Sequence, residues 1–596
     1  MIGQLWCAPG WGRPVGKGEA RRAVTGWLRT NARPLETPLG RQVTAVEAVM
    51  DGQNQTVCYW VKLQPMGWVL ASADDEIEPI IAFSASEDPD LSEATPLGNL
   101  VRRDVRRRLA HRFEPGERGP PSVLPGRTTR EKWDHLSIRS EGDESTATLM
   151  GASTVSDIRI PPLLALRWGQ GDVCGQPCFN YYTPNQYRAG CVATAMAQVM
   201  RHYQYPTAGI GRRSFEIRID GQAWMGVTIG GDGSGGPYLW SLMSEIPDCT
   251  TTVQQRQAIG ALCYDAGVSV GMKYTAADST TDTLKASDAL TGTFGFARAV
   301  RGYNGGSDIG AGLVMMLNPN LDAGAPVILG VVGAGGHAVV CDGYGYSEGT
   351  LYHHLNMGWN GWRDAWYNLP NIDSAPSYSS VHKVVYNIHT SASGEIVSGR
   401  VLDAGGQPLA GAQVYASPAL KGGGTPMTAT TDARGIYAFA ALKSGTSYSI
   451  TPFVDGYQFG SAAVKTGTSL NDRPVSGNYW GLDFPGNPLT ITAITPSSGP
   501  SHSSVRIQGV NFGTSAGAVH FLGGGTAEII SWSNTAIYCR VPAGTVSGNV
   551  QVETMQLHRS NGKYFRVTAP GYLVVEADGG FANMENGTAL YPFRTV

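Results

Sequence analysis

The sequence predicts a multidomain protein in which two α+β units precede two Ig-like all-β sandwiches and the start of a further β unit. The chain has 596 residues, enough for roughly four domains of ordinary size. Helix and strand patterns alternate up to about residue 390, and short strands between Gly, Asp and Pro turns follow. Gly is frequent, at 78 residues, and only 16% of the residues are charged, which suits a β-rich secreted protein.

Composition and charge argue against several classes of protein. The formal net charge of −3 gives no indication of a nucleic-acid partner. No run of ~18 apolar residues occurs, so we expect no membrane span. The N-terminus shows no basic region followed by an apolar one, so no signal peptide is visible. The protein is therefore either cytosolic or begins upstream of this sequence, and its composition leads us to predict a secreted or cell-surface location.

The first unit, residues 1–113, is predicted to be a small α+β domain. It begins with an amphipathic helix near residues 20–30, and strand-like runs follow at 57–62, 67–75 and 78–86. The segment after these strands is rich in arginine (102–112), and we interpret it as a solvated helix face, with a site for an anionic partner as the alternative. Pro, Gly, Arg and Ser then dominate without periodicity (114–156), which predicts a linker open to proteolysis.

The second unit, residues 157–390, mixes helices with strands. A helix is expected from Cys191, and another over 253–274. Two strands flank a glycine-rich turn within 326–346, and a further strand leads into a loop of aromatic residues and glycines within 351–369.

Short alternating strands predict β-sandwiches over residues 394–485 and 488–568. Residues 571–596 read as a third β unit that has barely begun when the sequence stops.

Cys191 stands at the head of its predicted helix, directly after Gly190. Apolar residues recur from it at helical spacing, namely Val192, Ala195, Met196, Val199 and Tyr203. Gly190 allows a sharp turn into the helix, and Pro206 closes the segment. The positive end of a helix dipole favours a thiolate over a thiol. Cys191 is therefore a candidate nucleophile, and the alternative is a buried structural cysteine.

A nucleophilic thiol needs a base, a group that orients the base and donors for the oxyanion. His337 follows Gly335 and Gly336 at the mouth of a strand, where its ring can face a cleft. The carboxamide of Asn356 can accept a hydrogen bond from the imidazole, and Trp359 can shield that bond from water. Upstream, the side-chain amide of Gln170 is a suitable oxyanion donor. These residues occur in the order Gln, Cys, His, Asn, which fits a cysteine–histidine enzyme.

The stretches LLALRWGQG, FNYY, AGCVATAMAQVMRHYQYPTAGIG, GVSVGMKY, GGHAVVCDGY and HLNMGWNGW occur in this order over about 160–370. Together they resemble the streptopain family of papain-like cysteine peptidases. The resemblance implies that Cys191 is the nucleophile, His337 the base and Gln170 the oxyanion donor. Asn356 and Trp359 would support the imidazole, and Gly190, Gly335 and Gly336 would line the substrate cleft. The sequence has Met357 and Asn360 where the family's NWGWGG loop has Trp and Gly.

Other parts of the chain resemble further modules. GWVLASADDEIEPIIAFS is similar to the family's inhibitory pro-domain. SGRVLDAGGQPLAGAQV and TTDARGIYAF resemble carboxypeptidase-regulatory-like modules, and ITPSSGPSHSSVRIQGVNFG resembles IPT/TIG modules. The tail NGTALYPFRTV resembles the opening of a right-handed parallel β-helix.

The predicted function is a secreted cysteine endopeptidase that hydrolyses peptide bonds through a Cys191–His337 thiolate–imidazolium pair and an acyl-enzyme, and that is made as a zymogen. Its substrates would be proteins or peptides, its pro-domain (1–113) would be its inhibitor, and 114–156 would hold the maturation site. No cofactor or metal is expected. The alternatives are a catalytically weak adhesion protein whose β-modules contact surfaces or carbohydrate, and an amidase or transglutaminase with the same Cys–His chemistry.

The spacing of Cys174 and Cys178 permits either a local disulfide or simple packing. A zinc site would use Cys174, Cys178, Cys191 and His337, but the chain offers no second close pair of ligands.

Overall fold

We describe the protein from a computed structural model. The structure describes residues 13–86 apart from 32 and 52, the single residues 91, 98, 101 and 105, and the segments 128–139, 156–331, 336–369, 381–391, 393–418 and 426–569. The arginine-rich stretch 102–112, most of the predicted linker, Gly335 and the predicted β-helix start (571–596) lie outside this part of the chain. Contacts between Cα atoms divide the chain into two compact units, which we describe separately. The first comprises residues up to Ser398 together with 438–446 and 466–480.

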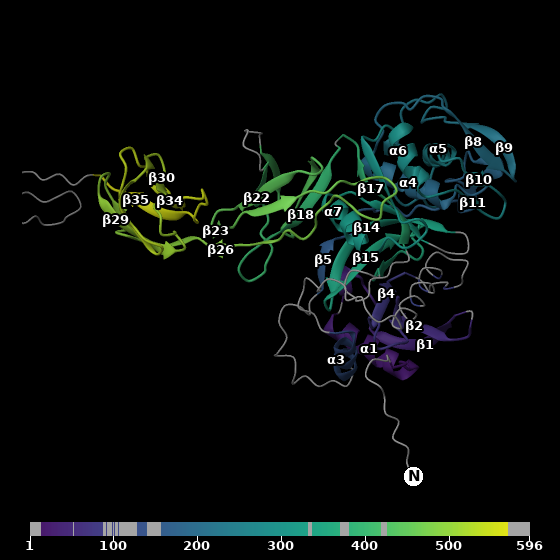
Figure 1. Cartoon of the computed structure of the whole chain (residues 1–596), viewed down its shortest axis with the longest axis horizontal. Coiled ribbons are helices and arrows are strands. Elements are labelled where there is room, and N and C mark those ends of the chain that lie inside the picture. Colours follow the sequence, from purple (N-terminus) through teal and green to yellow (C-terminus); the bar gives the residue numbers. More distant parts are fainter. Residues whose placement is uncertain are drawn as a thin grey trace, which may run out of the picture. The chain divides into compact units, whose positions relative to one another are not determined.

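The N-terminal part of the first unit is an α+β fold, as predicted. A meander of four antiparallel strands forms its sheet, with β1 at Gln42–Met50, β2 at Thr56–Gln64, β3 at Trp68–Ser72 and β4 at Ile80–Ser84. Two helices, α1 (Lys17–Thr30) and α3 (Thr129–Arg139), pack side by side against it (Figure 1). The fully buried Trp27 and Trp133 anchor the two helices in one core.

Helix α3 falls within the segment 114–156 that the sequence analysis interpreted as a linker. Trp133 is buried and donates a hydrogen bond from its ring nitrogen to the Ile77 carbonyl, at 3.0 Å. The composition of this segment did not indicate a helix, because most of its residues are polar or charged. Only a few apolar residues, such as Trp133, pack into the N-terminal core. Residues 129–139 are therefore an ordered part of the N-terminal fold.

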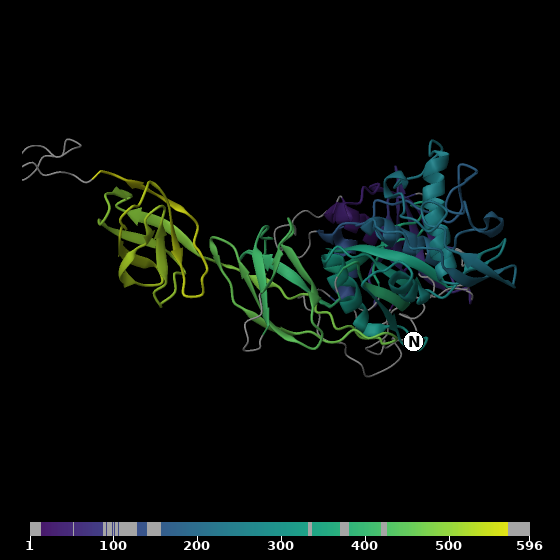
Figure 2. The ribbon, with the colours of Figure 1, turned by 90° about the horizontal axis from the view of Figure 1, so that it is seen from above.

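The strands of the N-terminal part continue into the sheet of the following part. The sheet order is β1-β2-β3-β4-β16-β15-β14-β13-β17-β12, with β5 beside β14. The junction pairs Phe83 and Ala82 of β4 with Trp366 and Tyr367 of β16. The purple and teal strands in Figure 2 thus belong to one sheet, although the sequence predicted two separate units.

The strands and helices that follow the N-terminal part frame the candidate site. The strands of the large sheet are β5 (Asp157–Ile160), β12 (Arg298–Tyr303), β13 (Val327–Val331), β14 (His337–Ser347), β15 (Thr350–Asn356), β16 (Ala365–Tyr367) and β17 (Val381–His389). A smaller sheet contains β8 (Ser214–Ile219), β9 (Gln222–Val227), β10 (Lys273–Tyr274) and β11 (Ser279–Thr280). The helices are α4 (Cys191–Tyr203), α5 (Val253–Ser269), α6 (Lys285–Gly292) and α7 (Leu313–Asp322).

Helix α4 is the central element of this core. Its residues from Val192 to Met200 are all buried, and it packs against both α5 and β14. Helix α5 begins with a capping box between Thr252 and Gln255. It ends at Ser269, earlier than the predicted 274, because Gly271 takes a positive φ of 61° and the chain turns into β10.

The second unit comprises residues 399–437, 447–465 and everything from Gly481. Its C-terminal part (residues 490–567) is a sandwich of two sheets around Ile507, Phe512 and Phe565. One sheet contains β27 (Thr490–Thr495), β29 (Ser504–Val510), β33 (Ala536–Arg540) and β32 (Glu528–Trp532). The other contains β28 (Ser498–Gly499), β35 (Lys563–Val567), β34 (Gly548–Glu553), β30 (Ala518–Phe521) and β31 (Gly525–Thr526).

The preceding all-β segment also forms two sheets. In one sheet the strand order is β21 (Ile436–Leu442), β18 (Glu395–Leu402) and β25 (Phe484–Pro485). In the other sheet the order is β20 (Met427–Thr430), β19 (Gln413–Pro418), β22 (Ser447–Phe453) and β24 (Ala462–Lys465). Residues 438–446 and 466–480 lie within the predicted sandwich 394–485 but are part of the first unit. The boundary between the units is therefore not a single point in the sequence.

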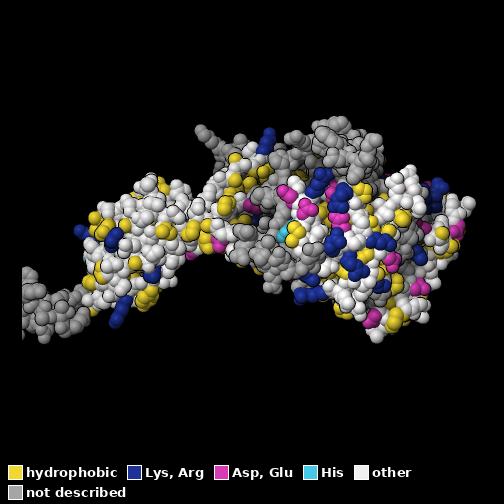
Figure 3. All heavy atoms as spheres, turned by 90° about the horizontal axis from the view of Figure 1, so that it is seen from below, with side chains coloured by type: hydrophobic (Ala, Val, Ile, Leu, Met, Phe, Trp, Pro, Cys, Tyr) yellow, Lys and Arg dark blue, Asp and Glu magenta, His cyan; other side chains and the backbone are white. Residues whose placement is uncertain are grey.

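The surface in Figure 3 shows basic side chains beside acidic ones, with hydrophobic side chains scattered between them. Among the described residues, no helix has both the length and the apolar character needed to cross a bilayer.

Candidate active site

Cys191 is the first residue of α4, as predicted. Gly190 precedes it with φ 92° and ψ 146°, a conformation that side-chain-bearing residues rarely adopt. A Cβ atom on Gly190 would lie 2.9 Å from the Ser279 carbonyl oxygen and 2.7 Å from the Met272 side chain. Glycine is thus required here, because the chain enters the helix through a narrow space between these two residues.

His337 is the first residue of β14, next to α4. The backbone of Ala338, the next residue on β14, adjoins the sulfur of Cys191 and lowers the pKa of its thiol. Because His337 directly precedes Ala338, and Asp278 is a nearby charge for both His337 and Cys191, the predicted base and the predicted nucleophile lie in one neighbourhood. Gly336 enters the strand with φ 65°, and Gly335 lies outside the described residues.

The imidazole of His337 is held on its far side by the loop after β15. Its Nε2 lies 3.1 Å from the carbonyl oxygen of Met357. This carbonyl can only accept, so Nε2 carries the hydrogen and Nδ1 presents a lone pair. The ring of Trp359 lies 6.0 Å from the imidazole at an interplanar angle of 81°. Trp359 is therefore beside the imidazole, where the sequence analysis placed it.

Asn356 does not orient the imidazole in this structure, contrary to expectation. Its Oδ1 accepts from Gln198 Nε2 and from the Gly358 amide, each at 3.0 Å, and its Nδ2 donates to the Leu166 carbonyl at 2.9 Å. The side chain faces α4 and, through the Gly358 amide, holds the start of the loop that follows β15. The Met357 carbonyl takes the acceptor role that was predicted for Asn356.

Gln170 is pinned next to the start of α4. Its carbonyl accepts from the Ala189 amide at 2.8 Å, and the adjacent Gly169 carbonyl accepts from Thr194 Oγ1 at 3.1 Å. The side chain of Gln170 is half-buried. The amide of Asn360 donates to the Trp168 carbonyl at 3.0 Å, so the loop that holds His337 meets the segment that carries Gln170. The predicted residues that the structure describes thus lie on neighbouring segments around the start of α4.

Burial dominates the protonation of the pair. It raises the pKa of the Cys191 thiol to about 11 and lowers the pKa of His337 to about 4. Asp278, on the turn before β11, is a nearby charge that raises both pKa values. Both groups are therefore neutral at pH 7 in this conformation. The helix dipole predicted a thiolate, but desolvation of the sulfur outweighs it.

Asp364 was missed by the sequence analysis. Its Oδ1 accepts from the Met357 amide at 2.8 Å, and burial raises its pKa to about 7. The signal in the sequence was weak, a single acidic residue amid the aromatic residues of the loop. Gln198 was missed for a different reason, because it reaches Asn356 from a helix 158 residues away in sequence.

The cysteines pair differently from either alternative considered for Cys174 and Cys178. Cys174 forms a disulfide with Cys249, with Cα atoms 5.3 Å apart, and Cys178 is free and buried. The zinc site considered as an alternative is also ruled out, because Cys174 is part of the disulfide. Among the described residues, no group of three or more His, Cys, Asp or Glu side chains could hold a metal ion.

Comparison with known proteins identifies the region that carries this site. Residues 168–367 match the Peptidase C10 family. The resemblance to the streptopain family is thereby confirmed, and this region is streptopain-like. The flanking regions match the Spi protease inhibitor (residues 12–102), the carboxypeptidase regulatory-like domain (396–471) and the IPT/TIG domain (489–565). The two all-β segments therefore have the Ig-like character that was predicted.

Known relatives resemble this region at moderate identity. Streptopain of Streptococcus pyogenes serotype M1 is 29% identical over 190 residues, which is 31% of this chain and 46% of streptopain. The thiol protease/hemagglutinin PrtT of Porphyromonas gingivalis is 30% identical over 216 residues, 35% of this chain and 24% of that protein. The chain thus spans about half the length of the streptopains it matches.

Two solved structures are also similar. A fragment of Prevotella intermedia prointerpain A gives a TM-score of 0.40 at 20% identity, covering 57% of this chain and 97% of the fragment. Active interpain A of the same organism gives a TM-score of 0.31 at 26% identity, covering 38% and 93%.

Proposed function

We propose that the protein is a cysteine endopeptidase in which Cys191 is the nucleophile and His337 the base. The shared surroundings of the two groups carry this proposal, because Ala338, the residue after His337, adjoins the Cys191 sulfur and Asp278 is near both groups. The match to a peptidase family supports it independently. The substrates would be proteins or peptides.

The geometry suggests a sequence of proton and bond movements. With Nε2–H donated to the Met357 carbonyl, Nδ1 of His337 takes the thiol proton as the sulfur attacks the scissile carbonyl carbon. The side-chain amide of Gln170 and the Cys191 backbone N–H at the start of α4 would stabilise the oxyanion. The imidazolium returns its proton to the leaving amine and an acyl-enzyme remains. Water, deprotonated by the same imidazole, then releases the acid and restores the thiol.

We further propose that the chain is a zymogen and that its N-terminal domain is the inhibitor. Residues 12–102 match a protease inhibitor family, and β4 of this domain pairs with β16, which follows the loop that holds His337. The disulfide between Cys174 and Cys249 favours an oxidising compartment and supports secretion.

A single comparison tests the proposal. The purified full chain is incubated in mild reductant with an unstructured protein substrate, alongside Cys191→Ala and a sample treated with a thiol-alkylating reagent. Only the untreated native chain should hydrolyse the substrate, and it should also release an N-terminal fragment. Substrate cleavage by pure Cys191→Ala would refute the assignment. An added primary amine that becomes attached to the substrate would indicate a transglutaminase instead.

The released fragment also tests the zymogen. Because α3 packs with the N-terminal fold, the fragment should end after Arg139, within 140–156. Mass spectrometry locates its end, and the fragment added back should inhibit the processed enzyme. Pure Cys191→Ala that loses the fragment as fast as the native chain would rule out self-processing.

A further inference from the structure

The loop between β15 and β16 (residues 357–364) holds the imidazole of His337, yet little regular structure fixes this loop. Gly358, Asn360, Gly361 and Arg363 all have positive φ values, between 58° and 76°. One backbone hydrogen bond, from the Trp362 amide to the Trp359 carbonyl at 2.9 Å, lies inside the loop. Such a backbone does not hold its own shape, so contacts with side chains must fix where its first residue lies.

Asp364 supplies such a contact at the base of the loop. Its Oδ1 accepts from the Met357 amide at 2.8 Å, and the carbonyl of the same Met357 lies 3.1 Å from His337 Nε2. The carboxyl group thus ties the last residue of the loop to its first. Met357 is the single residue between the Asp364 side chain and the imidazole.

The surroundings of Asp364 keep its carboxyl group in place. His354 and Arg167 are the nearby basic groups, and Asp342 is the nearby acidic one. Both carboxylate oxygens of Asp342 already have partners. Its Oδ1 lies 2.7 Å from His354 Nδ1, and its Oδ2 accepts a hydrogen bond from the Leu164 amide at 3.1 Å. Either the ionised or the protonated carboxyl of Asp364 can accept at Oδ1, so the link to Met357 does not depend on ionisation.

Asp364 also contacts the N-terminal domain. Its backbone carbonyl accepts a hydrogen bond from Oγ of Ser84 on β4, at 2.7 Å. Asp364, which fixes the loop, is therefore itself held by β4 of the N-terminal domain.

We propose that Asp364 is a positioning residue for the imidazole of His337. By fixing Met357, it keeps the Met357 carbonyl opposite Nε2, which selects the tautomer whose Nδ1 carries a lone pair. This inference rests on the proposed peptidase function and adds a residue to it. Asp364 touches neither the thiol nor the substrate, so it acts only through Met357.

The test compares Asp364→Ala with Asp364→Asn. Each variant is produced as the full chain and its kinetics are measured after the N-terminal fragment has been released. The amide oxygen of Asn can still accept from Met357, so Asp364→Asn should keep kcat within about threefold of the native value. Asp364→Ala should lower kcat by ~10–100-fold with KM within about twofold, the size expected when a reacting group is misplaced by about 1 Å. Equal loss in both variants would mean that the charge matters, and would overturn the proposal.

Asp322→Ala is the matched control. Asp322 accepts from Tyr344 Oη at 2.7 Å and from Ser398 Oγ at 2.6 Å, so its loss removes comparable hydrogen bonds. The control should lower the melting temperature as Asp364→Ala does, without the fall in kcat. If Asp364→Ala does not fold, Asp364→Ser replaces it, because its hydroxyl is too short to reach Met357. Native kcat in a folded Asp364→Ala or Asp364→Ser would refute the proposal.

A second readout separates this proposal from the proposed function. The rate of Cys191 alkylation by a small reagent is measured against pH for each variant, without any substrate. Asp364→Ala should displace the profile, and Asp364→Asn should reproduce the native one. If the native chain hydrolyses nothing, the peptidase proposal fails, while a displaced profile would still support the role of Asp364. Identical profiles in all three proteins would contradict it.

Discussion

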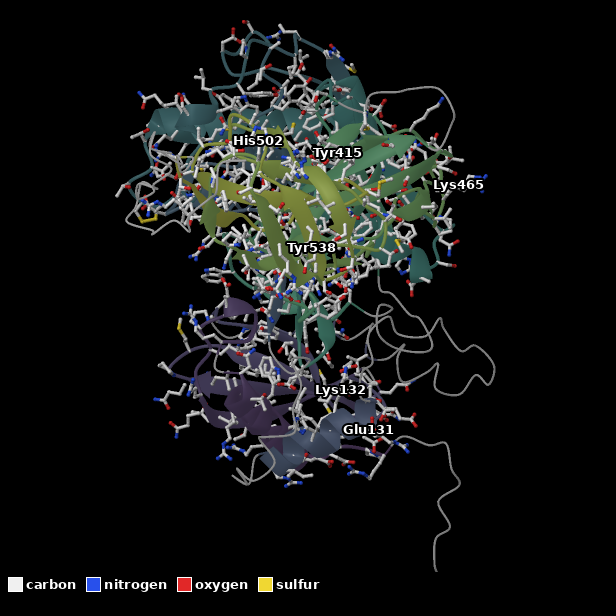
Figure 4. All side chains as sticks on the ribbon, turned by 90° about the vertical axis from the view of Figure 1, so that its left-hand side faces the viewer. Glu131, Lys132, Tyr415, Lys465, His502 and Tyr538 are labelled. Atoms are coloured by element: carbon white, nitrogen blue, oxygen red, sulfur yellow. A yellow bond between two sulfur atoms is a disulfide. The ribbon has the colours of Figure 1, made fainter. Side chains whose placement is uncertain are left out.

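Nζ of Lys132 lies 2.8 Å from Oε1 of Glu78, and both side chains are buried. Oγ1 of Thr350 completes the cluster, since it receives a hydrogen bond from Lys132 and donates one to Glu78, each at 2.9 Å. The three residues come from α3, the turn before β4 and the start of β15. Figure 4 marks Lys132 and Glu131 on α3. The cluster therefore links α3 and the turn before β4 to β15, the neighbour of the strand that carries His337.

Lys132→Met should loosen this link. The change leaves the buried Glu78 carboxylate without its cationic partner Lys132. Removing one member of a buried ion pair lowers the free energy of unfolding by ~3–5 kcal/mol. Denaturant unfolding followed by tryptophan fluorescence should show this loss, and the N-terminal fragment should separate sooner. Arg130→Met is the control, because Arg130 pairs with Glu76 in a half-exposed position and its loss should cost under ~1 kcal/mol. Equal losses in the two variants would show that the Lys132 cluster is not such a link.

Alkylation of Cys191 in the unprocessed chain should be slow at pH 7 and rise steeply toward alkaline pH. Burial raises the pKa of this thiol to about 11, so the thiolate fraction grows about tenfold per pH unit between 7 and 10. His337, whose pKa is lowered to about 4, stays neutral across this range and supplies no positive charge. Mass spectrometry of the labelled peptide gives the rate. If the alkylation rate of the unprocessed chain reaches a plateau below pH 8, the thiol pKa is not raised as we expect. In the processed enzyme, Cys191 should be alkylated rapidly well below pH 8.

Gln170→Ala should reduce kcat of the processed enzyme by ~10²–10³ with little change in KM, as expected for the loss of one oxyanion donor. Steady-state kinetics on a peptide substrate measure both constants. Gln176→Ala is the matched control, because Gln176 is exposed on the short hairpin strand β7 (Gln176–Pro177). If Gln176→Ala loses activity and Gln170→Ala does not, the oxyanion role passes to Gln176.

Removing the disulfide should destabilise the fold around Gln170. Cys174 and Cys249 are 75 residues apart in sequence, and loss of a native disulfide typically costs ~2–5 kcal/mol. The double variant Cys174→Ser, Cys249→Ser should melt at a lower temperature than the native chain, and added reductant should no longer change its melting. Cys178→Ser serves as the comparison, since Cys178 is free. Melting of the native chain that does not respond to reductant would argue against the bond.

The sequence allowed the positions of Cys191 at a helix start and His337 at a strand start to be predicted, because local rules determine both. Gly190 before Cys191 and the glycine turn before His337 each fix a backbone conformation at the end of a helix or strand. Trp359 was predictable for the same reason, since it lies in a short glycine-containing loop. The two sandwiches followed from alternation between turn residues, which also depends on neighbours in sequence.

Other features depend on partners that are distant in sequence. The direction of the Asn356 side chain is decided by Gln198 and Leu166, which no local pattern connects to it. The partner of Cys174 could not be inferred from spacing, because Cys249 approaches only in the folded chain. Helix α3 was hidden in a polar stretch whose ordering relies on Trp133. The protonation of Cys191 follows from burial by the whole fold, which outweighs the local helix dipole.

The pairing of β4 with β16 means that the N-terminal domain also shields a strand edge. If this domain leaves, the backbone groups of Ala365–Tyr367 that faced β4 lose their partners, and an unpaired edge invites other extended chains. β16 is only three residues long, which limits how firmly a second molecule could attach there. Departure of the N-terminal domain would thus leave a three-residue strand edge without a partner, directly after the loop that holds His337.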